Sequence, residues 1–385
     1  MKTRSAHTSR VGASRRLSRA VDAAALDDER DTPVLPTPWE REESLGARWL
    51  RRAVTVPAYL AAALLAIVLL PAVVVVTLVL DARELRRAPR TRFVVGVTFI
   101  LLCETAGLGG ALLNWTLAGG PFGSGSARAH QLDRALQRWW ASVLLHRGRR
   151  ILGLGLNVAA AEGVLDDGPI LVLARHASLV DSLLPCVLLD SFRLRYVLKR
   201  ELLWEPCLDI VGTRLPNAFV RRGVGDPGEI ARVAALARGL ERDEGVVLFP
   251  EGTRFTPERR QHLIDRLDAR GEAPRLHEAG SLRHVLPPRR GGVLALLEAA
   301  PTADVVILAH TGLEDAARLS DLWRGSLLGG TIDVELWRVP RAKIPADAAG
   351  REAWLQDCWR RVDQWVDAHR GAARRGTENS DTSAQ

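Results

Sequence analysis

The pattern of apolar and polar positions divides the chain into four segments. Residues 1–45 are rich in arginine and serine, then acidic, without apolar periodicity, and residues 371–385 are polar. Such segments cannot bury enough apolar surface to fold, so we expect two disordered tails. Long apolar runs fall within residues 46–120, and short apolar runs alternate with helical patterns within residues 121–370. The pattern therefore predicts an apolar hairpin followed by one folded domain.

The hairpin is predicted from two apolar runs, at residues 54–80 and 93–117. The first has no charged residue in 27 positions, and the second has one, Glu104. A helix of roughly 20 apolar residues crosses a bilayer. The runs are therefore interpreted as a membrane hairpin; two core helices of a water-soluble protein are the alternative, which the length of the first run disfavours.

Arginines flank the first run on both sides. They are Arg41, Arg48, Arg51 and Arg52 before it and Arg83, Arg86, Arg87, Arg90 and Arg92 after it. By the positive-inside rule both flanks should lie on the cytoplasmic side. A hairpin that enters only one leaflet satisfies both flanks, and Pro71 and Glu104 suit such a broken geometry. A hairpin that spans the bilayer is the alternative. Either way, we expect a cell-membrane protein whose folded domain faces the cytoplasm.

Residues 127–150 are predicted to form an amphipathic helix. Leucines and the pair Trp139 and Trp140 fall at helical spacing between arginines. The apolar face packs either on the domain of this chain or on the membrane surface, with the tryptophans at the interface.

From residue 151 the chain alternates between strand and helix patterns. Strand patterns lie at 169–174, 194–199, 245–250, 303–309 and 331–337, and helix patterns at 226–243, 290–300 and about 345–370. This alternation predicts an α/β domain with a mostly parallel central sheet flanked by helices. In such folds ligands bind where the strands end.

Two His and Asp pairs follow predicted strands. His176 precedes Asp181 by five residues, and His310 precedes Asp315 by the same spacing. A carboxylate that orients a histidine makes it an effective general base. The spacing alone does not distinguish the two pairs.

Basic residues also follow strands. The chain carries a net charge of +8, almost all of it from arginine, so Lys199, one of three lysines, is the more informative cation. Arg221 and Arg222 end the stretch NAFVRR, and Glu251, Gly252, Thr253 and Arg254 follow the predicted strand at 245–250. A glycine, a hydroxyl and a guanidinium together can hold a phosphate.

In combination these stretches resemble the glycerophospholipid acyltransferase family, which includes 1-acylglycerol-3-phosphate acyltransferases. His176 and Asp181 match its first motif, Phe219, Val220 and Arg222 its second, and residues 249–254 (FPEGTR) its third. The motif order favours His176 over His310 as the catalytic histidine. Arg175 stands where asparagine is frequent, and Leu308 replaces the usual proline of the fourth motif, which puts the identity of the substrate in question.

The resemblance implies an α/β acyltransferase domain in which His176, held by Asp181, deprotonates the acceptor hydroxyl. It assigns acceptor binding to Ser178, Lys199, Arg222, Glu251, Gly252, Thr253 and Arg254. The expected substrates are a lysophospholipid and acyl-CoA or acyl carrier protein as co-substrate, with membrane lipids as further partners and no metal or other cofactor.

Three other functional classes are weighed against an acyltransferase. A non-catalytic protein that binds phospholipid headgroups would not need His176. A hydrolase would use His176 with Ser178 or a metal, but the chain has no GxSxG elbow and no convincing metal spacing. A nucleic-acid binder is disfavoured because the basic residues are scattered and the chain has two tyrosines for stacking.

Overall fold

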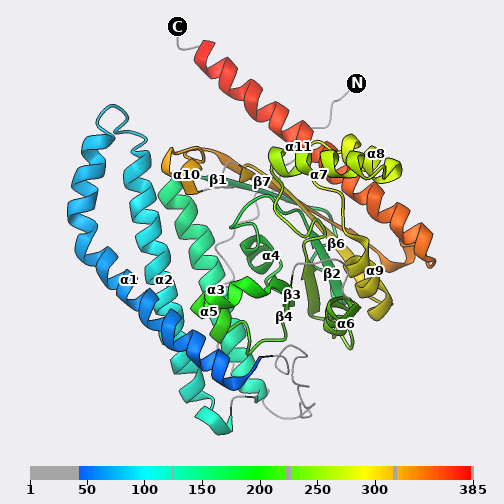
Figure 1. The fold of residues 1–385 in the computed structure, drawn as a ribbon, viewed down its shortest axis with the longest axis horizontal. Helices are drawn as coiled ribbons and strands as arrows, with labels where there is room; N and C mark the ends of the chain where they lie inside the picture. The colour runs from blue at the N-terminus through cyan, green and yellow to red at the C-terminus, as the bar shows by residue number, and fades with distance from the viewer. Residues whose placement is uncertain (1–42, 124, 222–226, 315–318, 383–385) are drawn as a thin grey trace, which may run out of the picture. The chain divides into compact units, whose positions relative to one another are not determined.

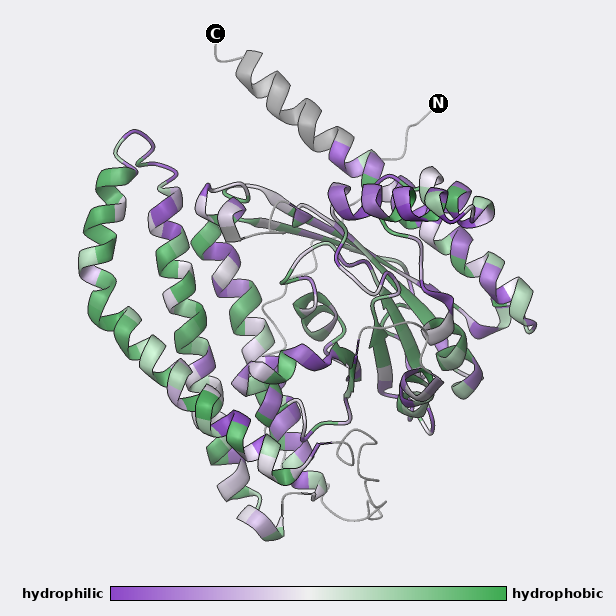
Figure 2. Cartoon of the chain, viewed as in Figure 1, coloured by the Kyte–Doolittle hydropathy of each residue, from purple (hydrophilic) through white to green (hydrophobic). Residues whose placement is uncertain are grey.

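The computed structural model describes residues 43–123, 125–221, 227–314 and 319–382, and for residues 319 and 371–382 the backbone only. The first elements are two antiparallel helices, α1 (Leu45–Leu80) and α2 (Pro89–Leu117), both strongly apolar (Figures 1 and 2). Both are long and apolar enough to cross a membrane. The predicted hairpin of two apolar helices is therefore confirmed.

The remaining elements form a mixed α/β domain. Its strands are β1 (Gly155–Ala160), β2 (Ile170–Ala174), β3 (Arg193–Lys199), β4 (Ala218–Val220), β5 (Glu244–Leu248), β6 (Asp304–Thr311) and β7 (Thr331–Val339). Its helices are α3 (Ala127–Leu152), α4 (Leu183–Leu188), α5 (Pro206–Ile210), α6 (Pro227–Leu236), α7 (Pro257–Ala269), α8 (Ala273–Ser281), α9 (Arg290–Ala299), α10 (Leu319–Trp323) and α11 (Ala348–Thr382).

The seven strands form one sheet in the order β1-β7-β6-β2-β5-β3-β4. All neighbours are parallel except β6 and β7. The mostly parallel sheet predicted from the sequence is therefore confirmed. The carboxyl ends of β2, β5 and β6 lie side by side near its centre, so the loops that follow them meet at one edge.

Both faces of the sheet are covered by helices (Figure 1). In β2, Leu171 and Leu173 face a core completed by α6, α9 and α11, whereas Ile170, Val172 and Ala174 face a core completed by α3 and α4. Successive side chains of a strand point to opposite faces. An uninterrupted apolar strand is therefore buried on both sides, as expected at the centre of a parallel sheet.

The hairpin and the α/β domain belong to one compact unit. Arg51 and Arg52 of α1 both donate to the fully buried carboxylate of Asp209 in α5, at 2.9 and 3.1 Å. Arg92 of α2 donates to the carbonyl of Ile151 at the end of α3 (2.8 Å). Several of the arginines that the sequence suggests as topological signals thus attach the hairpin to the domain.

The helix predicted at 127–150 is α3, and it packs against α2 and α4. Trp140 donates its indole N–H to Glu104 of α2 (3.1 Å), whereas Trp139 is largely exposed. Packing within the chain is thus observed for one of the two tryptophans. The sequence does not predict β1, which pairs with β7 at an edge, or β4, which has three residues.

Candidate active site

The site is built from loops that follow the carboxyl ends of neighbouring strands. His176 lies two residues after β2, and the segment Phe249–Arg254 follows β5. The backbone N–H of Phe255 donates to the carbonyl of His176 (2.6 Å), which joins the two loops directly. Because β2 and β5 are parallel neighbours, residues more than seventy positions apart meet here.

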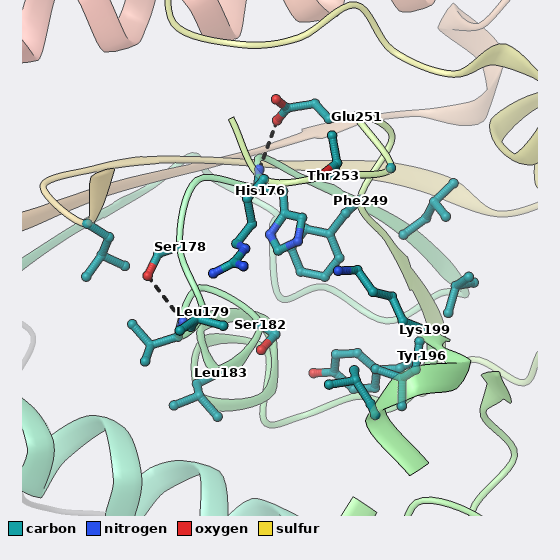
Figure 3. Close-up of a pocket in the computed structure, with 18 of the residues that line it drawn as sticks. His176, Ser178, Leu179, Ser182, Leu183, Tyr196, Lys199, Phe249, Glu251 and Thr253 are labelled. Carbon is teal, nitrogen blue, oxygen red and sulfur yellow. Dashed lines mark hydrogen bonds between the residues drawn. The ribbon is translucent and has the colours of Figure 1, made fainter. Parts of the chain in front are cut away.

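His176 and Asp181 form a hydrogen-bonded pair. Nδ1 of His176 lies 3.1 Å from Oδ1 of Asp181. A carboxylate is an acceptor, so this contact places the proton on Nδ1. Nε2 makes no hydrogen bond within the described part of the chain and is left with a lone pair. The His176 side chain is 15% exposed, lines a large cavity and packs on the ring of Phe249, 4.7 Å between centroids (Figure 3).

Asp181 is held by its own loop. The backbone N–H groups of Ala177 and Ser178 donate to Oδ2 at 2.7 and 2.8 Å. Burial would raise the pKa of this carboxyl, but the hydrogen bonds and charges of His176 and His310 outweigh burial and keep the pKa well below its usual range. Asp181 is therefore a carboxylate at neutral pH and can stabilise an imidazolium at His176.

Ser178 is completely buried, and its hydroxyl accepts the backbone N–H of Val180 at 3.2 Å (Figure 3). The geometry thus places both the amide and the hydroxyl of Ser178 within the turn that presents His176.

Glu251 connects two backbone segments. Oε1 accepts the N–H of His176 and Oε2 accepts the N–H of Leu286, each at 2.9 Å. The side chain is 2% exposed and points away from the His176 ring in Figure 3. Burial raises the pKa of Glu251 to about 8, although Arg175 and the two N–H donors favour its charged form. Both oxygens are thus occupied by the protein.

Gly252 and Arg254 sit at the basic side of the cavity. Gly252 has a φ of +67°, and a Cβ there would lie 2.6 Å from Nε of Arg289. Nη1 of Arg254 is buried without a hydrogen-bond partner in the described chain. Burial and the charge of Arg259 lower the pKa of Arg254. A bound anion would supply the missing acceptor and offset the repulsion between the two guanidinium groups.

One cavity of about 2060 Å³ joins these residues to the hairpin. At the hairpin its lining includes the apolar Phe93, Val97 and Ile100 of α2 beside Arg92 and Glu104, whereas at α7 it includes Arg259 and Arg266. Thr253 and Lys199 line the cavity between these ends, where Lys199 extends from the end of β3 toward the His176 side (Figure 3). The cavity can therefore accept a molecule with an anionic head and a long apolar tail.

The structure brings together eight of the nine residues that the resemblance selects. His176, Asp181, Ser178, Lys199, Glu251, Gly252, Thr253 and Arg254 all lie around this end of the sheet. The ninth, Arg222, lies outside the described residues, and so does Asp315.

Sequence reasoning set His310 aside, yet it lies in the site. Nε2 of His310 is 3.5 Å from Oδ2 of Asp181. The sequence carried no signal for this contact, because His310 lies in β6 and only the folded sheet shows that β6 is the other parallel neighbour of β2.

One group of side chains in the described part of the chain is close enough together to bind a metal. Its ligand atoms lie within 4.8 Å of one another and belong to Glu104, Glu205 and Cys207. The group lies where α2 meets α5. Burial and the neighbouring Glu104 raise the pKa of Glu205 well above its ordinary value. A metal would have to displace the proton of Glu205, because a carboxyl group binds a metal in its deprotonated form.

Comparisons with known proteins agree with the motifs. Residues 155–311 match the family model described as Acyltransferase. The resemblance predicted from the sequence is therefore confirmed for this segment. The crystal structure of the 1-acyl-sn-glycerophosphate (LPA) acyltransferase PlsC from Thermotoga maritima aligns with 72% of this chain and 99% of its own, at 14% identity and a TM-score of 0.48. No curated protein shows a significant sequence match.

Proposed function

We propose that the protein is a membrane-bound acyltransferase. It would move a fatty acyl group from acyl-CoA or acyl carrier protein to the free hydroxyl of a lysophospholipid. The acceptor that we propose is 1-acylglycerol-3-phosphate, and the product would then be phosphatidic acid. The observation that carries this proposal is that His176, oriented by Asp181, lines the same cavity as an apolar surface and Arg254, whose buried Nη1 has no hydrogen-bond partner in the described chain.

The chemistry needs one base and no covalent enzyme intermediate. Nε2 of His176 would take the proton of the acceptor hydroxyl while that oxygen attacks the thioester carbonyl carbon. The new C–O bond forms, the C–S bond breaks, and the departing sulfur receives the proton from His176. Asp181 would stabilise the imidazolium during the reaction.

Acceptor binding divides among the remaining residues. Arg254, Thr253 and the Gly252 backbone would hold the phosphate, with Lys199 adding positive charge. We assign Glu251 and Ser178 a positioning role, because Glu251 accepts the backbone N–H of His176 and the Ser178 hydroxyl accepts that of Val180 in the same loop. From the resemblance alone, we propose that Arg222 also binds the phosphate.

The hairpin would bring the site to its lipid substrate. Leu64 and Val68 of α1 are 64% and 65% exposed, although an exposed apolar surface of this kind is unfavourable in water. We propose that residues 46–120 bind the cell membrane and that residues 121–370 form the catalytic domain at its cytoplasmic face. The attachment of Arg51 and Arg52 to Asp209 supports a hairpin and a domain that move as one body.

A transfer assay tests the proposal. The full-length protein, purified in detergent, is incubated with labelled acyl-CoA or acyl-loaded carrier protein and a panel of lysophospholipids that differ in headgroup. We expect acyl transfer, fastest to lysophosphatidic acid. Release of free fatty acid without an acceptor would instead indicate a hydrolase, and headgroup binding without turnover would indicate a binding protein.

A further inference from the structure

Asp181 lies between two imidazole rings. Nδ1 of His176 lies 3.1 Å from Oδ1 and 3.2 Å from Oδ2, and Nε2 of His310 lies 3.5 Å from Oδ2. His176 lies in the loop after β2, and His310 lies near the end of β6. These two strands are parallel neighbours, with Ala174 opposite Leu308. His310 is completely buried and does not line the cavity, so it would act on the reaction through the residues that it contacts rather than through the substrate.

His310 is held in a fixed position. Its Nε2 is also 3.1 Å from the carbonyl of Arg175, so the N–H points between that carbonyl and Asp181. Its own carbonyl accepts Nη1 of Arg175 at 2.6 Å. Arg175 is fully buried and pairs with Glu314 at 2.5 Å. The arginine that departs from the usual asparagine thus fastens the loop of His176 to the strand of His310.

Packing alone does not account for a histidine at position 310. Nδ1 of His310 is buried without a hydrogen-bond partner in the described chain. An unmatched buried polar atom is unfavourable, and an apolar side chain would avoid it. Nε2–H is the group that compensates, because it donates to the Arg175 carbonyl and faces the Asp181 carboxylate.

We propose that His310 is a positioning residue for the acyl transfer, and this inference rests on the proposed function. By facing Oδ2, its N–H fixes the rotation of the Asp181 carboxylate, so that both carboxylate oxygens stay against Nδ1 of His176 and Nε2 of His176 stays aimed into the cavity. Two backbone N–H groups also bind Oδ2, so the loss of His310 weakens this alignment without abolishing it. The low pKa of Asp181, to which His310 contributes, agrees with this arrangement.

Three substitutions separate this role from packing. His310→Phe keeps a planar ring and removes the N–H, His310→Leu removes the N–H with a smaller side chain, and His310→Gln keeps an N–H donor. We expect kcat to fall about tenfold in the Phe and Leu variants with the acceptor KM unchanged, and His310→Gln to recover most of that loss. The Leu variant decides the comparison if the Phe variant does not fold, as judged by thermal melting.

A double-mutant cycle locates the effect. In an Asp181→Asn background, His310→Leu should cause no further loss of kcat, because the partner that it positions is already impaired. Four results would each overturn the proposal. The Phe and Leu variants could both keep a kcat within twofold of the parent, or the Gln variant could lose as much kcat as the Leu variant. The loss could also be confined to KM, or the losses of kcat in the double variant could be additive. No transfer by the parent protein would instead refute the proposed function.

Discussion

Gly252 lies so close to Arg289 that a Cβ on the glycine would come within 2.6 Å of the arginine Nε. Gly271 has nearly the same backbone conformation, with φ of +64° against +67°, but open space around it. Gly271→Ala should therefore lower stability by about 1 kcal/mol, the cost of the left-handed conformation alone, and keep full activity.

Gly252→Ala should cause the same backbone strain and should also displace the Arg289 side chain, which the new Cβ would contact. We expect a melting temperature similar to that of Gly271→Ala but a reduction in acyl transfer of at least about tenfold, since the phosphate-binding backbone shifts. Equal activity of the two variants would show that close packing at Gly252 has no role in the site.

Arg254→Gln should mainly raise the acceptor KM, about tenfold or more, because a phosphate held equally in ground and transition states contributes to binding and not to kcat. Arg238→Gln is the matched control, since Arg238 is exposed and outside the cavity. Steady-state kinetics with varied lysophosphatidic acid measure both. A reduced kcat with unchanged KM would assign Arg254 to the transition state instead.

The pair of Arg175 and Glu314 should make stability depend on pH. Burial would raise the pKa of Glu314, but the charges of Arg175 and His310 and a hydrogen bond from Arg175 lower it to about 2 from 4.5. A depressed carboxyl pKa stabilises the fold above the unfolded value and loses that contribution as pH falls from about 4.5 to about 2.

Glu314→Gln should therefore be less stable than the parent at pH 7 by about 3 kcal/mol, and the difference should shrink below pH 4.5. Thermal melts across this range measure it, with the exposed Glu298→Gln as the control. A difference that is constant with pH would mean that the Glu314 charge does not stabilise the fold.

The exposed apolar face of α1 should determine membrane binding. Leu64→Asp together with Val68→Asp places two charges on that face, each of which costs about 2.5–3.5 kcal/mol in the bilayer core. We expect the doubly substituted protein to leave lipid vesicles in a flotation assay. Leu165→Asp, at a position 54% exposed outside the hairpin, should float like the parent. If the parent, the doubly substituted protein and Leu165→Asp all floated with the vesicles, the hairpin would not be the membrane anchor.

Much of the fold is predictable because its central strands are buried on both faces. The strands β2, β5 and β6 appear in the sequence as uninterrupted apolar runs, and all five predicted strands are observed. The strand β4 has only three residues, and β1 has four exposed positions out of six, so neither carries an apolar signal.

The site was predicted in part for a similar reason. His176 and Asp181 interact within one turn, so their spacing along the chain reports on their contact. The contact of His310 with Asp181 depends on which strand lies beside β2, and that order is set by tertiary packing. Glu251 was assigned to acceptor binding from the family resemblance, whereas its burial and its N–H donors emerge only from the folded loops.

The most direct test is the rate of acyl transfer by His176→Ala. Removal of a general base lowers turnover by about 10²-fold or more, so we expect that loss with an unchanged melting temperature, while the exposed His277→Ala keeps the parent rate. A well-folded His176→Ala protein that transfers acyl groups at a near-normal rate would contradict the assignment of His176 as the catalytic base.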